Sequence, residues 1–526
     1  MLGVELKAWL LAVFSAVLQV VIFPLPNLYF LCWVAVAPLL VALLRSRRPE
    51  TLQLQGAVKL LPATSVQGFL LGYVCGILWY GGNCYWVYST MKQYGGINAA
   101  GAAGLLILFC LYLGLYHGLF GLCISLLAKL SERTALVLSP VVWVAVEFAR
   151  TRISGFPWDL LGTTQVDNVA LARIASVTGV YGLSLEIMIV NAAFAAAFLL
   201  RRHRRRALIV ASVGAVVVLQ AARWIPAAPF ATDRGALLVQ ANIPVLDSAD
   251  WTHQYFENTL TDLSRLSVSP SATEPQHADL IVWPESPAPF YTDDAPFRAA
   301  LSYTASSRQA WVVVGSVGVE NAKRAGQQIY NSAMLVGPDG EFKARYDKVH
   351  LVPFGEYVPF KNLLSFAGGL TKEVGDFTRG RSREPLQAGE VRLGIFICYE
   401  SIFPDEVRRF AKSGAQVFVN ISNDGWYGDS GAYAQHLKQA RMRAVENGRW
   451  LLRATNTGVT AAIDPNGRVV QSVPRKVRTV LQARYALESA TTFYTRHGDW
   501  LAYGCAIISL GAVLAALTPV KGTRQA

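Results

Sequence analysis

Three residues with complementary chemistry follow short apolar runs in the second half of the chain: Glu285, Lys348 and Cys398. A carboxylate can accept a thiol proton, a thiolate can attack a carbonyl carbon, and an ammonium group beside backbone N–H groups can hold the resulting oxyanion. Functional groups of α/β sheets gather at the carboxyl ends of strands. The pattern therefore predicts a nucleophilic cysteine site built from strand ends.

Cys398 stands apart from the other cysteines. The chain has 7 cysteines, and the other six lie in long apolar segments. Ser401 and Asp405 could cap or begin a helix after Cys398, and a helix N-terminus can help to stabilise a thiolate. The ordinary alternatives stay open, because a free cysteine is often core filler, a glutamate beside a proline is often a loop residue, and a lysine is usually solvated.

Other kinds of site lack their patterns in this sequence. The histidines of the polar half are scattered, and no CxxC or HExxH motif is present. The chain has no Walker A loop, and its Gly315-Ser316-Val317-Gly318 segment is too short to indicate a phosphate site. A G-x-S-x-G serine elbow is missing as well. We therefore expect no metal and no cofactor.

The elements that would position the three residues lie between 231 and 484. Short β-rich runs alternate there with helical stretches, and several runs are continuously apolar, which is typical of strands covered on both faces. We expect strands at 236–240, 280–283, 311–314, 332–336, 342–346, 391–397, 417–421, 451–454 and 460–463, and helices at 251–266, 405–413 and 432–447. The pattern predicts a layered α/β domain.

The rest of the chain is strongly apolar. Hydrophobic residues make up 53% of the sequence, and a helix needs about 20 apolar residues to cross a bilayer. Eight segments approach that length: 8–23, 28–44, 66–87, 100–127, 135–148, 171–200, 207–224 and 500–519. The second follows the first too closely for a cleaved signal peptide. We expect a polytopic α-helical membrane domain of seven helices at 1–226, a water-soluble domain at 227–490, and an eighth helix with a tail at 491–526.

Basic loops predict the orientation of these spans. Lys and Arg cluster at 45–48, 129–133 and 201–206, after the second, fourth and sixth spans. Because cytoplasmic loops retain positive charge, both termini are expected in the cytoplasm and the α/β domain outside, with Arg150 and Arg152 as a local exception. The net charge of +13 is explained mostly by these loops rather than by a nucleic-acid surface.

Some features of the spans are chemically unusual. Glu147 and Glu186 lie inside apolar runs, and a carboxylate in a membrane is costly and therefore a functional candidate. Glu147 could pair with Arg150 or Arg152, or form a purely structural ion pair. The aromatic residues at 85–88 are typical of an interfacial belt.

Several motifs resemble a known family. Trp283-Pro284-Glu285, Tyr346-Asp347-Lys348 and Cys398-Tyr399-Glu400 look like the Glu-Lys-Cys set of the nitrilase superfamily. With the seven-plus-one helix plan, they resemble more closely the bacterial apolipoprotein N-acyltransferases. The further segments that carry this resemblance are 85–88, 155–158, 239–244, 351–359, 422–429, 439–444 and 455–460.

The resemblance implies a nitrilase-like αββα sandwich on the periplasmic face of a bacterial inner membrane. The implied reaction moves an acyl chain from a phospholipid, typically phosphatidylethanolamine, to the α-amino group of the diacylglyceryl-cysteine of an apolipoprotein, through a ping-pong thioester on Cys398. This step completes lipoprotein maturation. The implied partners are that donor, that acceptor and inner-membrane lipids, with no nucleic acid and no cofactor, and we expect a monomer.

The resemblance also implies residue roles. Glu285 would be the general base, Lys348 the oxyanion stabiliser and Cys398 the nucleophile. The supporting and access residues would be Glu356, Tyr399 with its backbone N–H, Glu400, and Trp251 at the mouth of the site.

Other interpretations of the sequence stay open. The domain could be a membrane-tethered nitrilase-type amidase for a small substrate, or the outer part of a non-catalytic transporter or scaffold. After 351–359, the apolar side chains could form a flap that dips into lipid or could pack into the domain: Phe360, Leu363, Leu364, Phe366 and Leu370.

Overall fold

The protein is described from a computed structural model, which covers residues 3–48, 60–199, 202–245, 251–269, 278–286, 289–320, 327–357 and 377–518. The chain forms two compact units. One is helical and contains 1–87, 103–226 and 499–526, and the other is an α/β unit that contains 88–102 and 227–498. The apolar stretch that could form a flap or pack into the domain, Phe360 to Leu370, lies outside the described residues.

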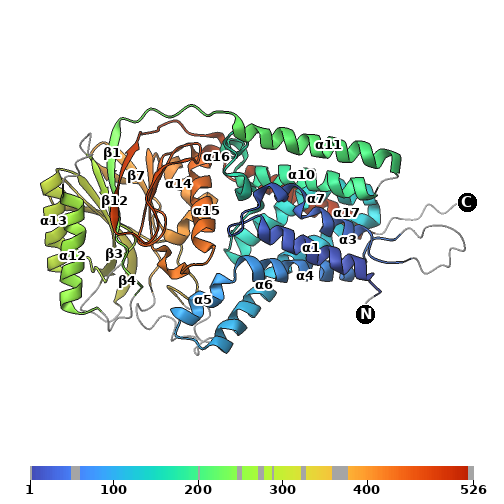
Figure 1. Ribbon diagram of the computed structural model, residues 1–526, viewed down its shortest axis with the longest axis horizontal. Helices are drawn as coiled ribbons and strands as arrows, with labels where there is room; N and C mark the ends of the chain where they lie inside the picture. Colours follow the sequence, from blue (N-terminus) through green and yellow to red (C-terminus); the bar gives the residue numbers. More distant parts are fainter. Residues whose placement is uncertain are drawn as a thin grey trace, which may run out of the picture. The chain divides into compact units, whose positions relative to one another are not determined.

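The helical unit contains a helix at each expected span (Figure 1). The principal helices are α1 (Leu6–Val21), α3 (Ala37–Leu44), α4 (Ser65–Asn83), α6 (Ala99–Leu130), α7 (Glu132–Ala149), α10 (Val180–Leu199), α11 (Arg202–Ala221) and α17 (Trp500–Leu517). Among the described residues, five helices are long and apolar enough to cross a membrane: α6, α7, α10, α11 and α17. These helices are consistent with a membrane domain.

Two expected spans are not single helices. The segment expected at 171–200 is divided into α8 (Val169–Ala172), α9 (Ala175–Thr178) and α10, and Gly179 between the last two has φ +67°. A positive φ ends a right-handed helix, and glycine adopts it without strain. Likewise 28–44 consists of a 3₁₀ turn at Tyr29–Leu31, then α2 (Cys32–Ala35) and α3. Hydrophobicity alone did not reveal these breaks.

Glycines allow α4 and α6 to approach closely. A Cβ atom on Gly72 would lie 2.1 Å from the His117 carbonyl oxygen, and one on Gly121 would lie 2.1 Å from that of Gly68. Small residues at helix interfaces have this function in membrane proteins, because water-driven burial is absent there and packing must hold the helices together.

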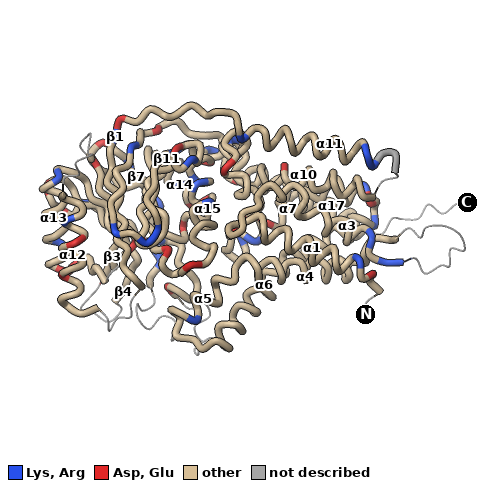
Figure 2. Tube along the Cα trace, in the orientation of Figure 1, with Lys and Arg blue, Asp and Glu red and all other residues tan. Residues whose placement is uncertain are grey.

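Basic residues gather at one end of the helical unit, where α3 ends and α11 begins (Figure 2). Arg45, just after α3, pairs with Glu132 at the start of α7 at 2.9 Å. Arg48 pairs with Glu5, just before α1, at 2.8 Å. The start of α1, the end of α3 and the start of α7 therefore share one end of the unit.

The two arginines expected beside Glu147 have other partners. Arg150 donates to the Tyr80 hydroxyl at 2.9 Å, and Arg152 donates to Asp499 at 2.6 Å. Glu147 Oε1 accepts from the Leu161 N–H at 2.7 Å. In the described part of the chain, the Glu147 carboxylate thus holds a backbone turn rather than a direct arginine pair.

The α/β unit contains two six-stranded sheets. The first has the order β12-β1-β2-β3-β4-β5, with β1 (Arg234–Gln240), β2 (Leu280–Val282), β3 (Trp311–Glu320), β4 (Gln328–Val336), β5 (Phe342–Asp347) and β12 (Thr479–Tyr485). The second has the order β11-β10-β9-β8-β7-β6, with β6 (Leu386–Ala388), β7 (Val391–Ile397), β8 (Val417–Ser422), β9 (Leu451–Thr455), β10 (Ala461–Ile463) and β11 (Val469–Ser472). Parallel pairing joins β1 to β2 and β2 to β3 in one sheet, and β7 to β8 and β8 to β9 in the other.

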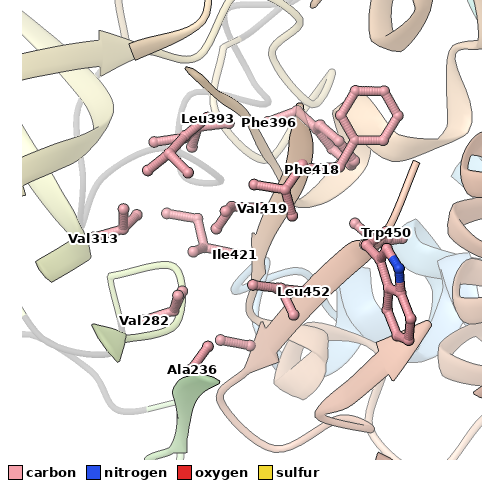
Figure 3. Close-up of a cluster of buried hydrophobic side chains, with 14 of the residues drawn as sticks. Ala236, Val282, Val313, Leu393, Phe396, Phe418, Val419, Ile421, Trp450 and Leu452 are labelled. Carbon is pink, nitrogen blue, oxygen red and sulfur yellow. The ribbon is translucent and has the colours of Figure 1, made fainter. Parts of the chain in front are cut away.

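Helices cover the outer faces of the two sheets (Figure 1). They are α12 (His253–Val268) and α13 (Ala295–Arg308) on the first sheet, and α14 (Pro404–Lys412) and α15 (Ala432–Asn447) on the second. Between the sheets, Val282 and Val313 lie on one side and Val419 and Ile421 on the other, all fully buried (Figure 3). This four-layer arrangement confirms the expected layered α/β domain.

Each expected strand and helix overlaps an observed one, but some elements were missed. Those missed between 231 and 485 are α13, β6, β11 and β12. The start of α13 carries a recognisable signal, since Asp294 caps it by accepting from the Phe297 N–H at 2.8 Å. The edge strand β11 alternates between half-buried and exposed residues, so it lacks the continuous apolar run by which its neighbours were found.

Candidate active site

The three candidate residues all lie at strand ends and are buried. Lys348 directly follows β5, Cys398 directly follows β7, and Glu285 lies just beyond β2. The loop that carries Glu285 lies tightly against β3, because a Cβ atom on Gly315 would be 2.4 Å from the Pro284 carbonyl oxygen. Gly315 therefore serves a close backbone approach rather than a phosphate loop.

Lys348 is bound by two carboxylates. Its Nζ donates to Glu285 Oε1 at 3.2 Å and to Glu356 Oε1 at 2.8 Å. The Asn331 side-chain amide donates to the same two oxygen atoms, at 2.8 and 2.6 Å. We call Glu285, Lys348, Glu356 and Asn331 the carboxylate cluster. Because the Oε1 atoms of Glu285 and Glu356 each accept from both Lys348 and Asn331, the four side chains fix one another's positions.

Backbone groups hold the outer oxygens of the cluster. Glu285 Oε2 accepts from the Asn423 N–H at 2.8 Å, and Glu356 Oε2 accepts from the Val352 N–H at 2.7 Å. Asn423 follows β8 of the second sheet, whereas Glu285 follows β2 of the first. The carboxylate of Glu285 therefore links the two sheets at their carboxyl ends.

Lys348 carries its charge in spite of complete burial. Burial alone would lower the pKa of its ammonium group, but the negative charges of Glu285 and Glu356 outweigh this effect and raise the pKa well above the usual value. Lys348 is thus a fixed positive charge in a site with little water, where such a charge acts strongly on a developing oxyanion.

Cys398 begins a 3₁₀ turn at Cys398–Ile402 and has φ +50°, which is unusual for a residue other than glycine. Burial raises the pKa of its thiol above the ordinary range, the charge of Glu285 adds to this rise, and Lys348 only partly offsets it. The expected thiolate at a helix N-terminus is not what the structure has, because α14 begins only at Pro404. The resting group is a neutral thiol that needs a base.

Glu400 binds backbone on both sides of the site. Its carboxylate accepts from the Tyr346 hydroxyl at 2.8 Å, from the Val349 N–H at 2.7 Å and from the Ile397 N–H at 2.8 Å. These groups belong to the segment around Lys348 and to the residue before Cys398. Glu400 therefore fixes the position of one loop relative to the other.

Two further predicted residues lie among aromatic groups. Tyr399 is buried, with its ring 5.3 Å from that of Phe403. Trp251 is half-buried just before α12, with its ring 5.0 Å from that of Tyr255. The described contacts of Trp251 are with this ring and the core beneath α12, so its location at the mouth of the site stays a prediction.

The segment 88–102 belongs to the α/β unit, although it was grouped with the membrane spans. The Tyr94 hydroxyl donates to the Gly425 carbonyl at 3.1 Å, and the Thr90 hydroxyl donates to that of Trp426 at 2.9 Å. The segment thus holds the loop that follows Asn423.

Sequence reasoning missed Asn331, which lies inside β4 and belongs to no motif identified there. The polar residues Asn331 and Ser332, which interrupt the apolar residues of this strand, were the available signal. His436, Asp424 and Arg453 were also missed, and they form a buried network beneath Cys398. Asp424 was quoted within a motif without a role.

Comparison with known families gives two matches along the chain. The model of the Carbon-nitrogen hydrolase family matches residues 238–494, and that of the Apolipoprotein N-acyltransferase N-terminal domain matches residues 15–193. The first match contains every residue of the carboxylate cluster as well as Cys398.

Curated relatives resemble nearly the whole chain. An apolipoprotein N-acyltransferase of Geobacter metallireducens is 35% identical over 97% of this chain and 95% of its own length. One of Methylococcus capsulatus is 37% identical over 84% of this chain and 86% of its own. Among solved structures, a carbon-nitrogen hydrolase of Helicobacter pylori G27 is 19% identical with a TM-score of 0.36, over 48% of this chain and 88% of that one.

Proposed function

The chain belongs to the apolipoprotein N-acyltransferase family, and from this premise we propose that it transfers an acyl chain from a phospholipid to the N-terminal α-amino group of a diacylglyceryl-cysteine through a thioester on Cys398. That the protein is an acyltransferase of lipoprotein biosynthesis follows from the family. The observation that carries the detailed mechanism is the charged Lys348 bound by Glu285 and Glu356 in the same buried site as the Cys398 thiol.

In the first half-reaction, Glu285 accepts the proton of the neutral thiol as sulfur attacks the ester carbonyl carbon. The carbonyl oxygen becomes an oxyanion, which the Lys348 ammonium and the Tyr399 backbone N–H stabilise. The ester C–O bond then breaks, the proton on Glu285 passes to the leaving alkoxide, and a lysophospholipid departs. An acyl thioester remains on Cys398.

In the second half-reaction, the α-amino group of the acceptor attacks the thioester carbon. Glu285 accepts a proton from the nitrogen, the C–S bond breaks, and the thiol recovers that proton. The product is an amide. Because an amide is more stable than a thioester, the second half-reaction runs downhill and draws the overall transfer forward without an energy-rich cofactor. Phosphatidylethanolamine is the donor that we propose for the first half-reaction.

An intact-mass measurement tests this mechanism. Purified protein incubated with phosphatidylethanolamine should gain the mass of one acyl chain, and hydroxylamine, which cleaves thioesters, should remove it. The adduct should vanish in Cys398→Ala and persist in Cys123→Ala, which changes a half-buried cysteine of α6. If wild-type protein forms no hydroxylamine-sensitive adduct, the thioester mechanism is refuted.

The membrane topology belongs to the same proposal. Eight spans with both termini in the cytoplasm would expose the α/β unit to the periplasm, beside the outer leaflet of a bacterial inner membrane. The shared basic end of α1, α3 and α7 supports this arrangement, since positive charge stays on the cytoplasmic side. A membrane location also spares the enzyme the extraction of an acyl chain, at about 0.8 kcal/mol per exposed CH₂.

Labelling of intact cells with a membrane-impermeant maleimide tests the topology. A cysteine introduced at exposed Ser306 in the α/β unit should react in intact cells. One introduced at Arg48, which follows α3, should react only after permeabilisation. The reverse pattern would overturn the proposed orientation.

The family comparison and the contacts of Lys348 each argue against one of the alternative functions. A membrane-tethered amidase for a small substrate does not account for a relative that matches 97% of the chain, membrane part included. A non-catalytic scaffold does not account for a buried lysine kept charged by two carboxylates, because the burial of ionised groups is costly even when they are paired.

A further inference from the structure

The main-chain carbonyl of Cys398 is bound by a buried histidine. His436 Nε2 lies 3.0 Å from this oxygen and 2.8 Å from the Ser401 hydroxyl. His436 lies on α15 and is completely buried. A carbonyl oxygen can only accept a hydrogen bond, so His436 must carry a proton on Nε2 to make this contact.

The far side of the histidine ring is anchored by an ion pair. Nδ1 lies 3.0 Å from Asp424 and 3.1 Å from Arg453, and Arg453 donates to both carboxylate oxygens of Asp424, at 3.0 and 2.9 Å. All three side chains are buried. Arg453 also donates to Asn420, so the anchor is attached to the second sheet.

Asp424 also lies within electrostatic range of the Cys398 thiol. The Ser422 hydroxyl donates to Asp424 Oδ1 at 2.8 Å, and Ser422 and Asp424 both influence the pKa of the thiol. One carboxylate therefore contacts both Ser422 and the histidine that lies against the Cys398 carbonyl. Burial and the charge of Arg453 lower the pKa of His436, so the ring is uncharged at neutral pH. The contact with the Cys398 carbonyl then requires the proton on Nε2, which leaves Nδ1 to accept from Arg453.

The contact matters because of the geometry of the peptide bond. The Cys398 carbonyl and the Tyr399 N–H belong to one planar trans peptide and point in opposite directions. A donor fixed on the carbonyl therefore sets the direction of the N–H, and it also polarises the N–H, since linked hydrogen bonds strengthen one another. The left-handed φ of Cys398 is strained for a residue other than glycine, and such contacts help to hold it.

We infer that His436 is a positioning residue for the oxyanion site, and that it directs and polarises the Tyr399 N–H by holding the Cys398 carbonyl. This inference rests on the proposed function, in which that N–H stabilises the oxyanion. His436 touches neither substrate nor the reacting sulfur in this role, and it acts through the peptide unit alone.

Two reactions of the same thiol separate this role from a general structural one. Acylation by phosphatidylethanolamine forms an oxyanion, whereas alkylation by iodoacetamide displaces iodide from carbon and forms none. In His436→Phe, we expect the rate of acyl-enzyme formation to fall by about one to two orders of magnitude. This is less than the factor of about 10²–10³ that removal of an oxyanion donor costs, because the Tyr399 N–H remains and only its orientation is lost. The alkylation rate at pH 9 should change less than about threefold, because alkylation does not use the oxyanion donor.

A conservative variant and a distant control complete the set. His436→Gln retains an N–H donor and should recover much of the acylation rate. His497→Phe makes the same change at an exposed position of α16 (Phe493–His497) and should match the wild type in both reactions.

The inference is overturned if His436→Phe acylates at the wild-type rate, or if acylation and alkylation fall together. If wild-type protein forms no acyl adduct at all, the proposed function fails instead, and the two failures are therefore distinguishable.

A measurement on the unaltered protein covers the case in which His436→Phe does not fold. ¹⁵N NMR of histidine-labelled wild-type protein, assigned by the signal missing from His436→Gln, should show the Nε2–H tautomer for His436. An unprotonated Nε2 would leave the Cys398 carbonyl without this donor and would refute the inference.

Discussion

Replacement of Asn331 by leucine should disable the site without disturbing the fold. Leucine has the same γ-branched arrangement of heavy atoms as asparagine, but it has neither a donor nor an acceptor. The Asn331 amide donates to Glu285 Oε1 at 2.8 Å and to Glu356 Oε1 at 2.6 Å. The variant would leave two buried carboxylates with Lys348 as their only shared side-chain donor.

The magnitude follows from these contacts. A hydrogen bond to a charged group contributes about 1.5–3 kcal/mol, so the loss of both corresponds to about 3–6 kcal/mol. Glu285 keeps the Asn423 N–H and Glu356 keeps the Val352 N–H, so we take the lower end, about 3 kcal/mol. If the transition state for acylation loses about 3 kcal/mol of stabilisation, the acylation rate falls by about two orders of magnitude, because each interval of about 1.4 kcal/mol changes a rate about tenfold.

Rapid-quench intact mass measures the rate of acyl-enzyme formation directly. Asn447→Leu is the matched control, because Asn447 is also buried and also makes two side-chain hydrogen bonds, with Arg443 on α15 and Thr495 on α16. It should lower thermal stability but leave the rate per folded molecule unchanged. The reasoning is refuted if Asn331→Leu acylates at the wild-type rate, or if the two variants lose rate equally.

Three further outcomes follow from the buried charges. Because burial raises the pKa of the Cys398 thiol, its thiolate fraction at a given pH is smaller than that of free cysteine. Alkylation by iodoacetamide should therefore still rise with pH beyond pH 9, and a midpoint below that of free cysteine would contradict this. The Val349 and Ile397 N–H groups bind different oxygens of Glu400, so Glu400→Gln turns an amide donor toward one of them and should lower the apparent melting temperature, as followed by tryptophan fluorescence. An unchanged value would argue against the role of Glu400 in holding the two loops. Asp424→Asn leaves Arg453 as an unpaired buried charge, which should cost about 3–5 kcal/mol, and retention of wild-type thermal stability would show that the pair is not structural.

Most strands and helices could be predicted because short-range patterns in the sequence indicate them. Continuous apolar runs gave β7 and β8 nearly to the residue, since strands covered on both faces have no polar side. Predictions of strands and helix ends were less accurate where no continuous apolar run marks them. The edge strand β11 alternates, and the break at Gly179 depends on a backbone angle that hydrophobicity does not report.

The residues of the candidate site also fall into those that local patterns indicate and those that depend on long-range contacts. Glu285, Lys348 and Cys398 follow strands and lie in recognisable motifs, so their types and positions could be identified from the sequence. Asn331 could not be assigned a role, because its contacts with Glu285 and Glu356 join residues 46 and 25 positions away. The segment 88–102 was taken for part of the membrane domain because aromatic residues beside a span suit an interface equally well.

The sequence by itself determined which reactive groups are available: a thiol, a carboxylate and an ammonium group, each at the end of a strand. It also determined the apolar segments that indicate a membrane domain. Only the tertiary structure decided the state of those groups. Burial makes the Cys398 thiol neutral rather than a thiolate, and two carboxylates keep Lys348 charged. The physical reason is that a pKa and the aim of a peptide N–H depend on neighbours across the two sheets, such as His436 and Asn423, which no local pattern reveals.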